Sequence, residues 1–270
     1  MLPERIGRKL GRQGVAWVYG SFWRIAAATG MLAALTPDFA AAQQVKPDDA
    51  RLEAEFVAFD SPAGYGKGCG YLVRPADATA PLPLVLVVHE NRGLNPHIRD
   101  VARRMALEGF VALAPDFLSP NGGTPANEDE ARAMFQSLDM AGATANGEAT
   151  RAFLAGHEKT NGKVGAIGFC WGGSVAYLVN ARIGLPAVSY YGGRTVPLLG
   201  ERPKAPLLLH FGENDPLISA EDVAKHREAL PDAEIHVWPG AGHGFNCDQR
   251  ADYDEATSRQ AMERTLTFLQ

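Results

Sequence analysis

The sequence predicts an α/β fold in which a mostly parallel central sheet is flanked by helices on both faces. Apolar runs alternate along the chain with amphipathic stretches of helical period, as expected when each strand is followed by a helix. Several apolar runs are continuous Val, Leu, Ile and Ala segments, which is typical of strands covered on both faces. The hydrophobic content of 46% and the charged content of 21% are those of a folded globular chain.

The individual elements follow from these patterns. We expect strands at residues 55–59, 70–73, 84–89, 111–114, 164–169, 187–191, 207–211 and 234–237. We expect helices at residues 97–107, 128–138, 143–155, 172–181, 220–229 and 254–269. Ser219 followed by Asp222 resembles a capping box and marks the start of the helix near residue 220. With no internal repeat and no linker, residues 52–270 are expected to form a single domain.

The first 42 residues have the order of an export signal. The segment carries five basic residues against two acidic ones. All five basic residues precede an uncharged stretch, residues 25–37, and Ala40 and Ala42 then stand at the −3 and −1 positions of a cleavage site. The stretch is shorter than the ~20 residues that span a bilayer, so we expect no stable membrane span after its removal. We predict a periplasmic protein that begins near Gln43, with residues 43–51 as a polar lead-in. The alternative is a cytoplasmic protein with an uncleaved extension, and the export route stays open.

Composition also limits the partners. A formal net charge of −5 argues against nucleic acid, because phosphate binding needs a concentrated basic surface. Three cysteines without CxxC spacing, and histidines without the i,i+4 or HxH spacing of ligands, argue against a metal site. We therefore expect neither a metal nor a cofactor, and the oligomeric state is left open.

The segment GFCWGG, residues 168–173, places Cys170 between an expected strand and an expected helix. This is the pattern of a nucleophile elbow with cysteine in place of serine. The N-terminus of the following helix favours the thiolate, and the backbone N–H of Trp171 would face a developing oxyanion. The alternative is a tight turn with a buried, inert thiol.

An acid and a base follow the nucleophile in chain order. Asp215 follows the strand at residues 207–211, and His243 lies in a glycine-rich loop after the strand at residues 234–237. Nucleophile, acid and histidine occur in this order in folds that carry the elbow. Glu213 is the alternative acid.

A further carboxylate follows an earlier strand. Glu90 and Asn91 come directly after residues 84–89. The amide of Asn91 would supply a second oxyanion donor, and Glu90 could accept the proton of Cys170. Glu90 could instead bind Arg92, Arg99 or solvent.

These motifs together resemble the dienelactone hydrolase family, also called carboxymethylenebutenolidases. The segments that carry the resemblance are HENRGLN (89–95), GFCWGG (168–173), GEND (212–215) and GHGF (242–245), and it covers roughly residues 52–269. It implies the α/β-hydrolase fold, with Cys170 as nucleophile, His243 as base and Asp215 as its orienting acid. It also implies Glu90 as the carboxylate that meets the resting thiol, with an oxyanion hole formed by the amides of Asn91 and Trp171.

The sequence departs from the family where members that act on dienelactone hold the substrate carboxylate. The matching positions for a serine and two arginines are Gly244, Cys247 and Glu128. Arg132 and Arg194 are candidates to replace the arginines, and Tyr191 is expected to line the pocket. Cys69 and Cys247 could pair in an oxidising compartment, although free thiols are the main expectation.

The functional prediction is a hydrolase that opens lactones or cleaves small carboxylic esters through a cysteine acyl-enzyme. The partner is thus a small-molecule ester or lactone. One alternative is a broad-specificity esterase or thioesterase without lactone preference. The other is a catalytically silent scaffold of this fold that binds a small hydrophobic ligand.

Overall fold

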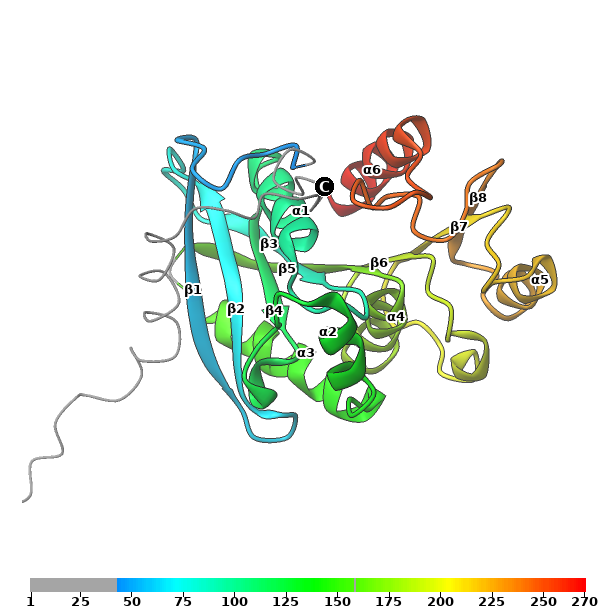
Figure 1. The fold of residues 1–270 in the computed structure, drawn as a ribbon, viewed down its shortest axis with the longest axis horizontal. Helices are drawn as coiled ribbons and strands as arrows, with labels where there is room; N and C mark the ends of the chain where they lie inside the picture. Colours follow the sequence, from blue (N-terminus) through cyan, green and yellow to red (C-terminus); the bar gives the residue numbers. More distant parts are fainter. Residues whose placement is uncertain (1–42, 158) are drawn as a thin grey trace, which may run out of the picture. The chain divides into compact units, whose positions relative to one another are not determined.

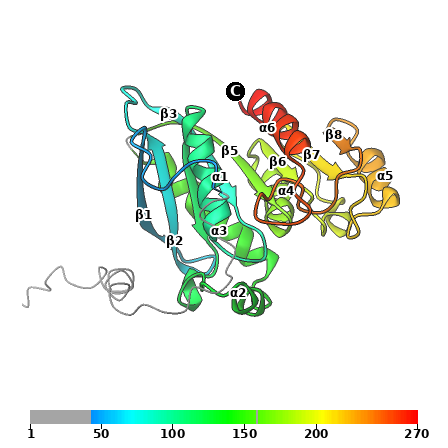
Figure 2. The ribbon, with the colours of Figure 1, turned by 45° about the horizontal axis from the view of Figure 1, so that its top comes forward.

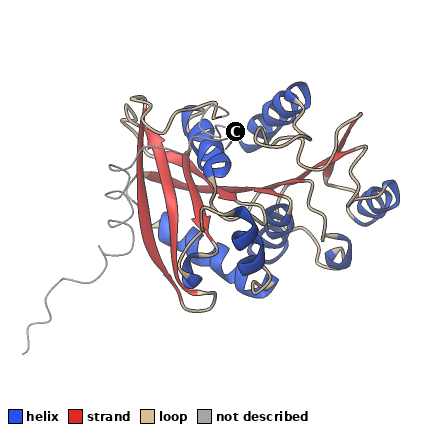
Figure 3. Cartoon of the chain, viewed as in Figure 1, coloured by secondary structure: helices blue, strands red, loops and turns tan. Residues whose placement is uncertain are grey.

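The computed structural model describes residues 43–157 and 159–270. The predicted export segment, residues 1–42, lies outside them. The described chain contains one eight-stranded sheet in the order β1-β2-β4-β3-β5-β6-β7-β8, flanked by helices (Figures 1 and 3). In the sheet, β3 lies between β4 and β5. The chain therefore forms β4 on one side of β3 and then crosses over to form β5 on the other side.

The strands fall into two groups by direction. β1 (Leu52–Ser61) and β2 (Gly66–Pro75) form an antiparallel hairpin, and β2 is also antiparallel to β4 (Val111–Asp116). The neighbouring pairs from β4 to β8 are all parallel. The remaining strands are β3 (Leu82–Val88), β5 (Thr160–Phe169), β6 (Ala187–Tyr190), β7 (Leu207–Gly212) and β8 (Glu234–Trp238). The predicted mostly parallel α/β class is confirmed.

Helices cover both faces of the sheet. Figures 1 and 2 show α1 and α6 on one face, with α3 and α4 on the other. The α-helices are α1 (Pro96–Leu107), α2 (Glu128–Phe135), α3 (Met140–Ala155), α4 (Trp171–Ile183), α5 (Ala220–Ala229) and α6 (Glu255–Leu269). Short 3-10 turns occur at Ser119–Asn121 and Val196–Leu198.

Local signals set several of the helix ends. The capping box of Ser219 and Asp222 at the start of α5 is confirmed. The helix expected from residue 143 begins at Met140, because the side chain of Asp139 accepts a hydrogen bond from the amide of Gly142. The helix expected to reach residue 138 ends at Phe135.

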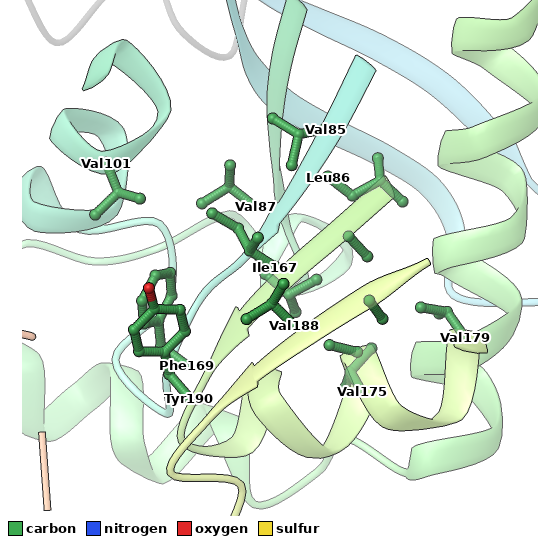
Figure 4. Packing of buried hydrophobic residues seen from close by; sticks show 14 of the residues in the cluster. Val85, Leu86, Val87, Val101, Ile167, Phe169, Val175, Val179, Val188 and Tyr190 are labelled. Atoms are coloured by element: carbon green, nitrogen blue, oxygen red, sulfur yellow. The ribbon is translucent and has the colours of Figure 1, made fainter. Parts of the chain in front are cut away.

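The central strands are buried on both faces, which is why their sequences are continuously apolar. Val85, Ile167 and Val188 on three neighbouring strands have no exposed surface. Figure 4 shows these side chains packed together, with Phe169 and Tyr190 at one end of the cluster. The ends of β5 and β6 that lead into the loops are therefore fixed by the core.

The segment expected as a polar lead-in is anchored to α1. The buried carboxylate of Asp100 accepts hydrogen bonds from the amides of Gln44 and Val45, at 3.2 and 2.8 Å. Arg103 donates to the carbonyl of Val45 at 2.8 Å, and the Val45 side chain is buried. A buried carboxylate must be hydrogen-bonded to offset its desolvation, and these partners lie 55 residues or more away in sequence.

None of the helices in the described part of the chain has the length and apolar character needed to cross a membrane.

Candidate active site

Cys170 occupies the turn between β5 and α4. Its backbone φ is 54° and its ψ is −113°, a conformation that non-glycine residues rarely adopt. A Cβ on Gly168 would lie 1.9 Å from the carbonyl oxygen of Gly172, and one on Gly172 would lie 2.3 Å from the carbonyl oxygen of Val88. The turn therefore requires glycine at both positions. The predicted elbow geometry is present, and it presents the sulfur at the N-terminus of α4.

The imidazole of His243 lies between Cys170 and Asp215. Its Nε2 is 3.1 Å from the Cys170 sulfur, and its Nδ1 is 2.8 Å from Asp215 Oδ2. Burial lowers the pKa of His243, but the hydrogen bonds with Asp215 and Cys170 outweigh this effect and raise the pKa to about 10. The structure thus brings the three predicted residues into one hydrogen-bonded chain.

Asp215, rather than Glu213, is the acid in this chain. Its side chain is fully buried, and its second oxygen accepts from the amide of Leu217 at 2.8 Å. Glu213 instead accepts a hydrogen bond from the amide of Gly240 on the surface. Both carboxylates follow β7, and only Asp215 reaches the histidine.

The two predicted oxyanion donors lie at the ends of β3 and β5. Trp171 is the first residue of α4, so its amide has no acceptor within the helix. The amide of Asn91 donates to none of the backbone carbonyls in the described residues. Both amides are therefore available to a substrate oxygen.

Glu90 is held by two partners from distant parts of the chain. Its carboxylate forms an ion pair with Arg250 and accepts a hydrogen bond from the Tyr191 hydroxyl at 3.4 Å. Burial, followed by the charge of Glu90, raises the pKa of Tyr191 well above its ordinary value, so this phenol stays a neutral donor. The partner is thus not Arg92 or Arg99.

Arg250 is the residue of this site that sequence reasoning missed. It lies seven residues after His243, and its side chain is 19% exposed. The available signal was a basic residue in the loop that carries the histidine. Arg92, the neighbour in sequence, pairs with Glu128 instead.

His89 supports the site without belonging to the predicted set. Its Nε2 accepts a hydrogen bond from the amide of Phe117 at 3.1 Å, so the proton sits on Nδ1 and is donated to the carbonyl of Glu90 at 2.6 Å. Burial lowers the pKa of His89. The neutral ring stacks on Trp171 with 5.9 Å between centroids. It therefore contacts both Glu90 and Trp171, whose amide is a predicted oxyanion donor.

The other predicted pocket residues are less closely connected. Arg132 is half exposed and pairs with Asp129 on its own helix. In the described residues, no hydrogen bond or ion pair joins Arg132 or Arg194 to the site, so their role stays a prediction. Gly244 has a φ of 84° and lies beside Arg250.

Two further findings concern the cysteines and metals. Cys170 and Cys247 are free thiols, so the open possibility of a disulfide between Cys69 and Cys247 is not realised. Within residues 43–157 and 159–270, no three His, Cys, Asp or Glu side chains are grouped so that they could hold a metal ion.

The parallel sheet and its elbow define the α/β-hydrolase class of protein. Residues 69–270 match the sequence model of the "Dienelactone hydrolase family", and the chain belongs to this family. It is a hydrolase of the dienelactone hydrolase type.

Named relatives agree with this assignment. The chain is 34% identical to the "Putative carboxymethylenebutenolidase" of Escherichia coli K12 over 82% of its length and 88% of the relative. It is 31% identical to the "Carboxymethylenebutenolidase" of Pseudomonas putida, over 71% of this chain and 87% of that one. A crystal structure of a "Putative Dienelactone Hydrolase" from Klebsiella pneumoniae superposes with a TM-score of 0.71 at 30% identity, covering 80% of this chain and 98% of that chain.

Proposed function

We propose that this hydrolase opens lactones or cleaves small carboxylic esters through a covalent intermediate on Cys170. The observation that carries the proposal is the hydrogen-bonded chain from the Cys170 sulfur through His243 to Asp215. A nucleophile, a base within hydrogen-bond reach and a group that orients the base are what acyl transfer requires. The positive φ of the cysteine adds the strained elbow that such a nucleophile occupies.

In the first half of the reaction, His243 Nε2 holds the proton that leaves the Cys170 thiol. The sulfur then forms a bond to the substrate carbonyl carbon, and the carbonyl oxygen becomes an oxyanion facing the amides of Asn91 and Trp171. Collapse breaks the carbon–oxygen bond of the ester, and His243 gives its proton to the leaving oxygen. A thioester remains on Cys170; with a lactone, the new hydroxyl stays attached to the acyl group.

In the second half, His243 takes a proton from a water molecule that attacks the thioester carbon. The carbon–sulfur bond breaks, the acid is released and Cys170 returns to its starting state. Asp215 keeps the proton on Nδ1 of His243 throughout and stabilises the imidazolium. Its buried hydrogen bond at 2.8 Å supports this role.

We assign Glu90 an electrostatic role, because its carboxylate and Cys170 both lie near Tyr191. A carboxylate near a thiol disfavours the thiolate, and in this arrangement the Arg250 guanidinium balances the carboxylate. We propose that Glu90 keeps the resting thiol protonated in part until substrate changes these surroundings, and that the proton then passes to His243. Glu90→Gln removes the negative charge, so Cys170 should be alkylated by iodoacetamide faster at pH 6–7 while ester turnover falls. Superimposable alkylation profiles would remove Glu90 from the mechanism.

The direct test of the function uses residues 43–270 and p-nitrophenyl acetate. We expect turnover in the parent, its loss after treatment with iodoacetamide, and mass-spectrometric detection of an acyl group on Cys170. A panel of lactones, carboxylic esters and thioesters then separates a lactone hydrolase from a broad-specificity esterase or thioesterase. Turnover that survives complete alkylation of Cys170 contradicts the cysteine mechanism.

The location of the protein is a separate proposal. We propose that residues 1–42 are a cleaved export signal and that the protein acts in the periplasm, because their charge pattern and Ala40 and Ala42 follow the order of such signals. Amino-terminal sequencing of the protein from its native host should begin near Gln43, in the periplasmic fraction. An intact Met1 in the cytoplasmic fraction contradicts this proposal.

A further inference from the structure

A second cysteine, histidine and aspartate lie together on α1 and on the loop that follows β8. Cys247 is 1% exposed, and the side chains of His97 and Asp248 are 0% and 7% exposed. His97 Nδ1 lies 2.9 Å from Asp248 Oδ1, and the other oxygen of Asp248 accepts from Arg104 at 2.6 Å. This buried group is not used by the mechanism described above.

Two buried nitrogen donors beside Cys247 lack a hydrogen-bond partner among the residues that the structure describes. They are Nε2 of His97 and Nε of Arg250. A buried donor left without an acceptor destabilises the fold, and a charged donor does so more strongly. The sulfur of Cys247 is a polar atom near both of them, and a cysteine sulfur can accept hydrogen bonds.

The charges of these side chains agree with an acceptor at Cys247. Burial lowers the pKa of His97, but the hydrogen bond with Asp248 and the nearby Cys247 raise it to about 9, so the ring carries two N–H donors at neutral pH. Burial also lowers the pKa of Arg250, and the Glu90 carboxylate, with Cys247 nearby, raises it above its ordinary value. Cys247 therefore lies between two cationic donors.

We propose that the Cys247 sulfur accepts hydrogen bonds from His97 and Arg250 and thereby holds the Arg250 guanidinium on Glu90. Cys247 is then a positioning residue for the hydrolytic site. It acts through Arg250 and Glu90 and does not touch the substrate. The proposal rests on the proposed function, because the reacting group whose surroundings it sets is the Cys170 thiol.

The consequence is electrostatic. The titratable and charged groups around this cluster are His97, Arg104, Asp248, Arg250, Glu90 and Tyr191. While Arg250 is held, its charge compensates the buried carboxylate of Glu90. If Arg250 is released, the uncompensated carboxylate disfavours the thiolate of Cys170. Loss of the acceptor at Cys247 should therefore lower the reactivity of the Cys170 sulfur, which lies more than seventy residues away in sequence.

The test compares three substitutions of Cys247 in the 43–270 protein. Cys247→Ala removes the acceptor, Cys247→Val removes it while keeping apolar volume, and Cys247→Ser replaces it with a hydroxyl acceptor. The measured quantity is the rate at which iodoacetamide modifies Cys170, followed by mass spectrometry against pH. We expect the alanine and valine variants to react about tenfold more slowly at pH 6–7, which corresponds to one pKa unit. We expect kcat for p-nitrophenyl acetate to fall with little change in KM, and serine to restore most of both.

Matched controls separate this role from a structural one. Cys69→Ala changes another cysteine that is not the proposed nucleophile, and its profile should match the parent. Arg250→Gln removes the positioned group itself and should slow alkylation in the same direction, even if the Cys247 variants fold poorly. In a Glu90→Gln background, Cys247→Val should cause no further shift.

Two results overturn the inference. One is an alkylation profile of the folded valine variant that superimposes on the parent, with only the melting temperature changed. The other is an unchanged profile in Arg250→Gln. Failure of the proposed function gives a different result, because Cys170→Ala would then keep its turnover. The alkylation profile of Cys170 does not depend on turnover, so the two failures are distinguishable.

Discussion

The chain contains two groups of a cysteine, a histidine and an aspartate, and they differ in backbone and burial. In the first, Cys170 lies on a strained turn at the N-terminus of α4, and the His243 side chain is 11% exposed. In the second, Cys247 and His97 are buried, and Cys247 lies in an irregular loop. The same residue types can therefore serve as a reaction centre or as internal support, and their surroundings decide which.

The partners of the two histidines explain the division further. His243 contacts the Cys170 sulfur through Nε2 and the Asp215 carboxylate through Nδ1. Asp215 in turn accepts a hydrogen bond from the backbone amide of Leu217. His97 shares its aspartate with Arg104, which in turn binds Asp100 on α1. The first group ends at the half-buried sulfur of Cys170, whereas the second continues into a network of ion pairs.

The largest expected effect separates the two cysteines by activity. Cys170→Ala removes the proposed nucleophile and should lower kcat for p-nitrophenyl acetate by at least roughly a thousandfold, with the fold intact. Cys69→Ala should keep most of the activity. Circular dichroism and steady-state kinetics on the purified variants make the measurement. Comparable activity in the Cys170 variant would move the chemistry to another residue, with Ser174 or Ser189 to be tested next.

Substitution of Asp215 should likewise affect activity more than substitution of Asp248. Asp215→Asn leaves His243 without its orienting carboxylate and should lower kcat by roughly 10²–10⁴. Asp248→Asn weakens a buried hydrogen bond and should lower the free energy of unfolding by about 1–3 kcal/mol, with a smaller loss of kcat. Urea titrations beside the kinetics distinguish these outcomes. If Asp248→Asn lowered kcat as much as Asp215→Asn, the division between the two groups would be wrong.

The two turns of the first group, the elbow of Cys170 and the turn that follows His243, should tolerate substitution differently. An alanine at Gly168 would place its Cβ 1.9 Å from a backbone oxygen, so Gly168→Ala should cost at least about 3 kcal/mol of stability or prevent folding. Gly244→Ala meets its nearest atom at 3.5 Å and mainly suffers from the positive φ, at a cost of about 1–2 kcal/mol. Equal losses in chemical denaturation would show that the elbow is not the tighter turn.

The last comparison concerns the pH dependence of stability. Folding raises the pKa of His97 from 6.5 to about 9 and that of His243 from 6.5 to about 10. A raised pKa stabilises the fold fully below pH 6.5, and this contribution is lost as pH rises toward the folded value. Melting temperatures should therefore fall between pH 6.5 and about 10. In His97→Gln the fall between pH 6.5 and about 9 should be shallower, and an unchanged slope would contradict the charge assigned to His97.

Both the fold and the principal site were largely predictable because their signals are local. Buried parallel strands are continuously apolar, and the carboxyl ends of such strands meet at one edge of the sheet. Cys170, Asp215 and His243 each follow one of these strands, so their meeting required only the strand order. The ends of β1 were less predictable, because its residues are largely exposed and it extends by pairing with β2 rather than by apolar pattern.

The sequence by itself determined the α/β class, the elbow at Cys170 and the order of nucleophile, acid and base. Only the tertiary structure decided that Arg250 binds Glu90, 160 residues away, and that His97 meets Asp248, 151 residues away. It also showed that Gln44 and Val45 are anchored on Asp100. Ion pairs of this kind leave no periodicity along the chain. They form because a buried charge must find a partner, and the fold, not the neighbouring sequence, supplies it.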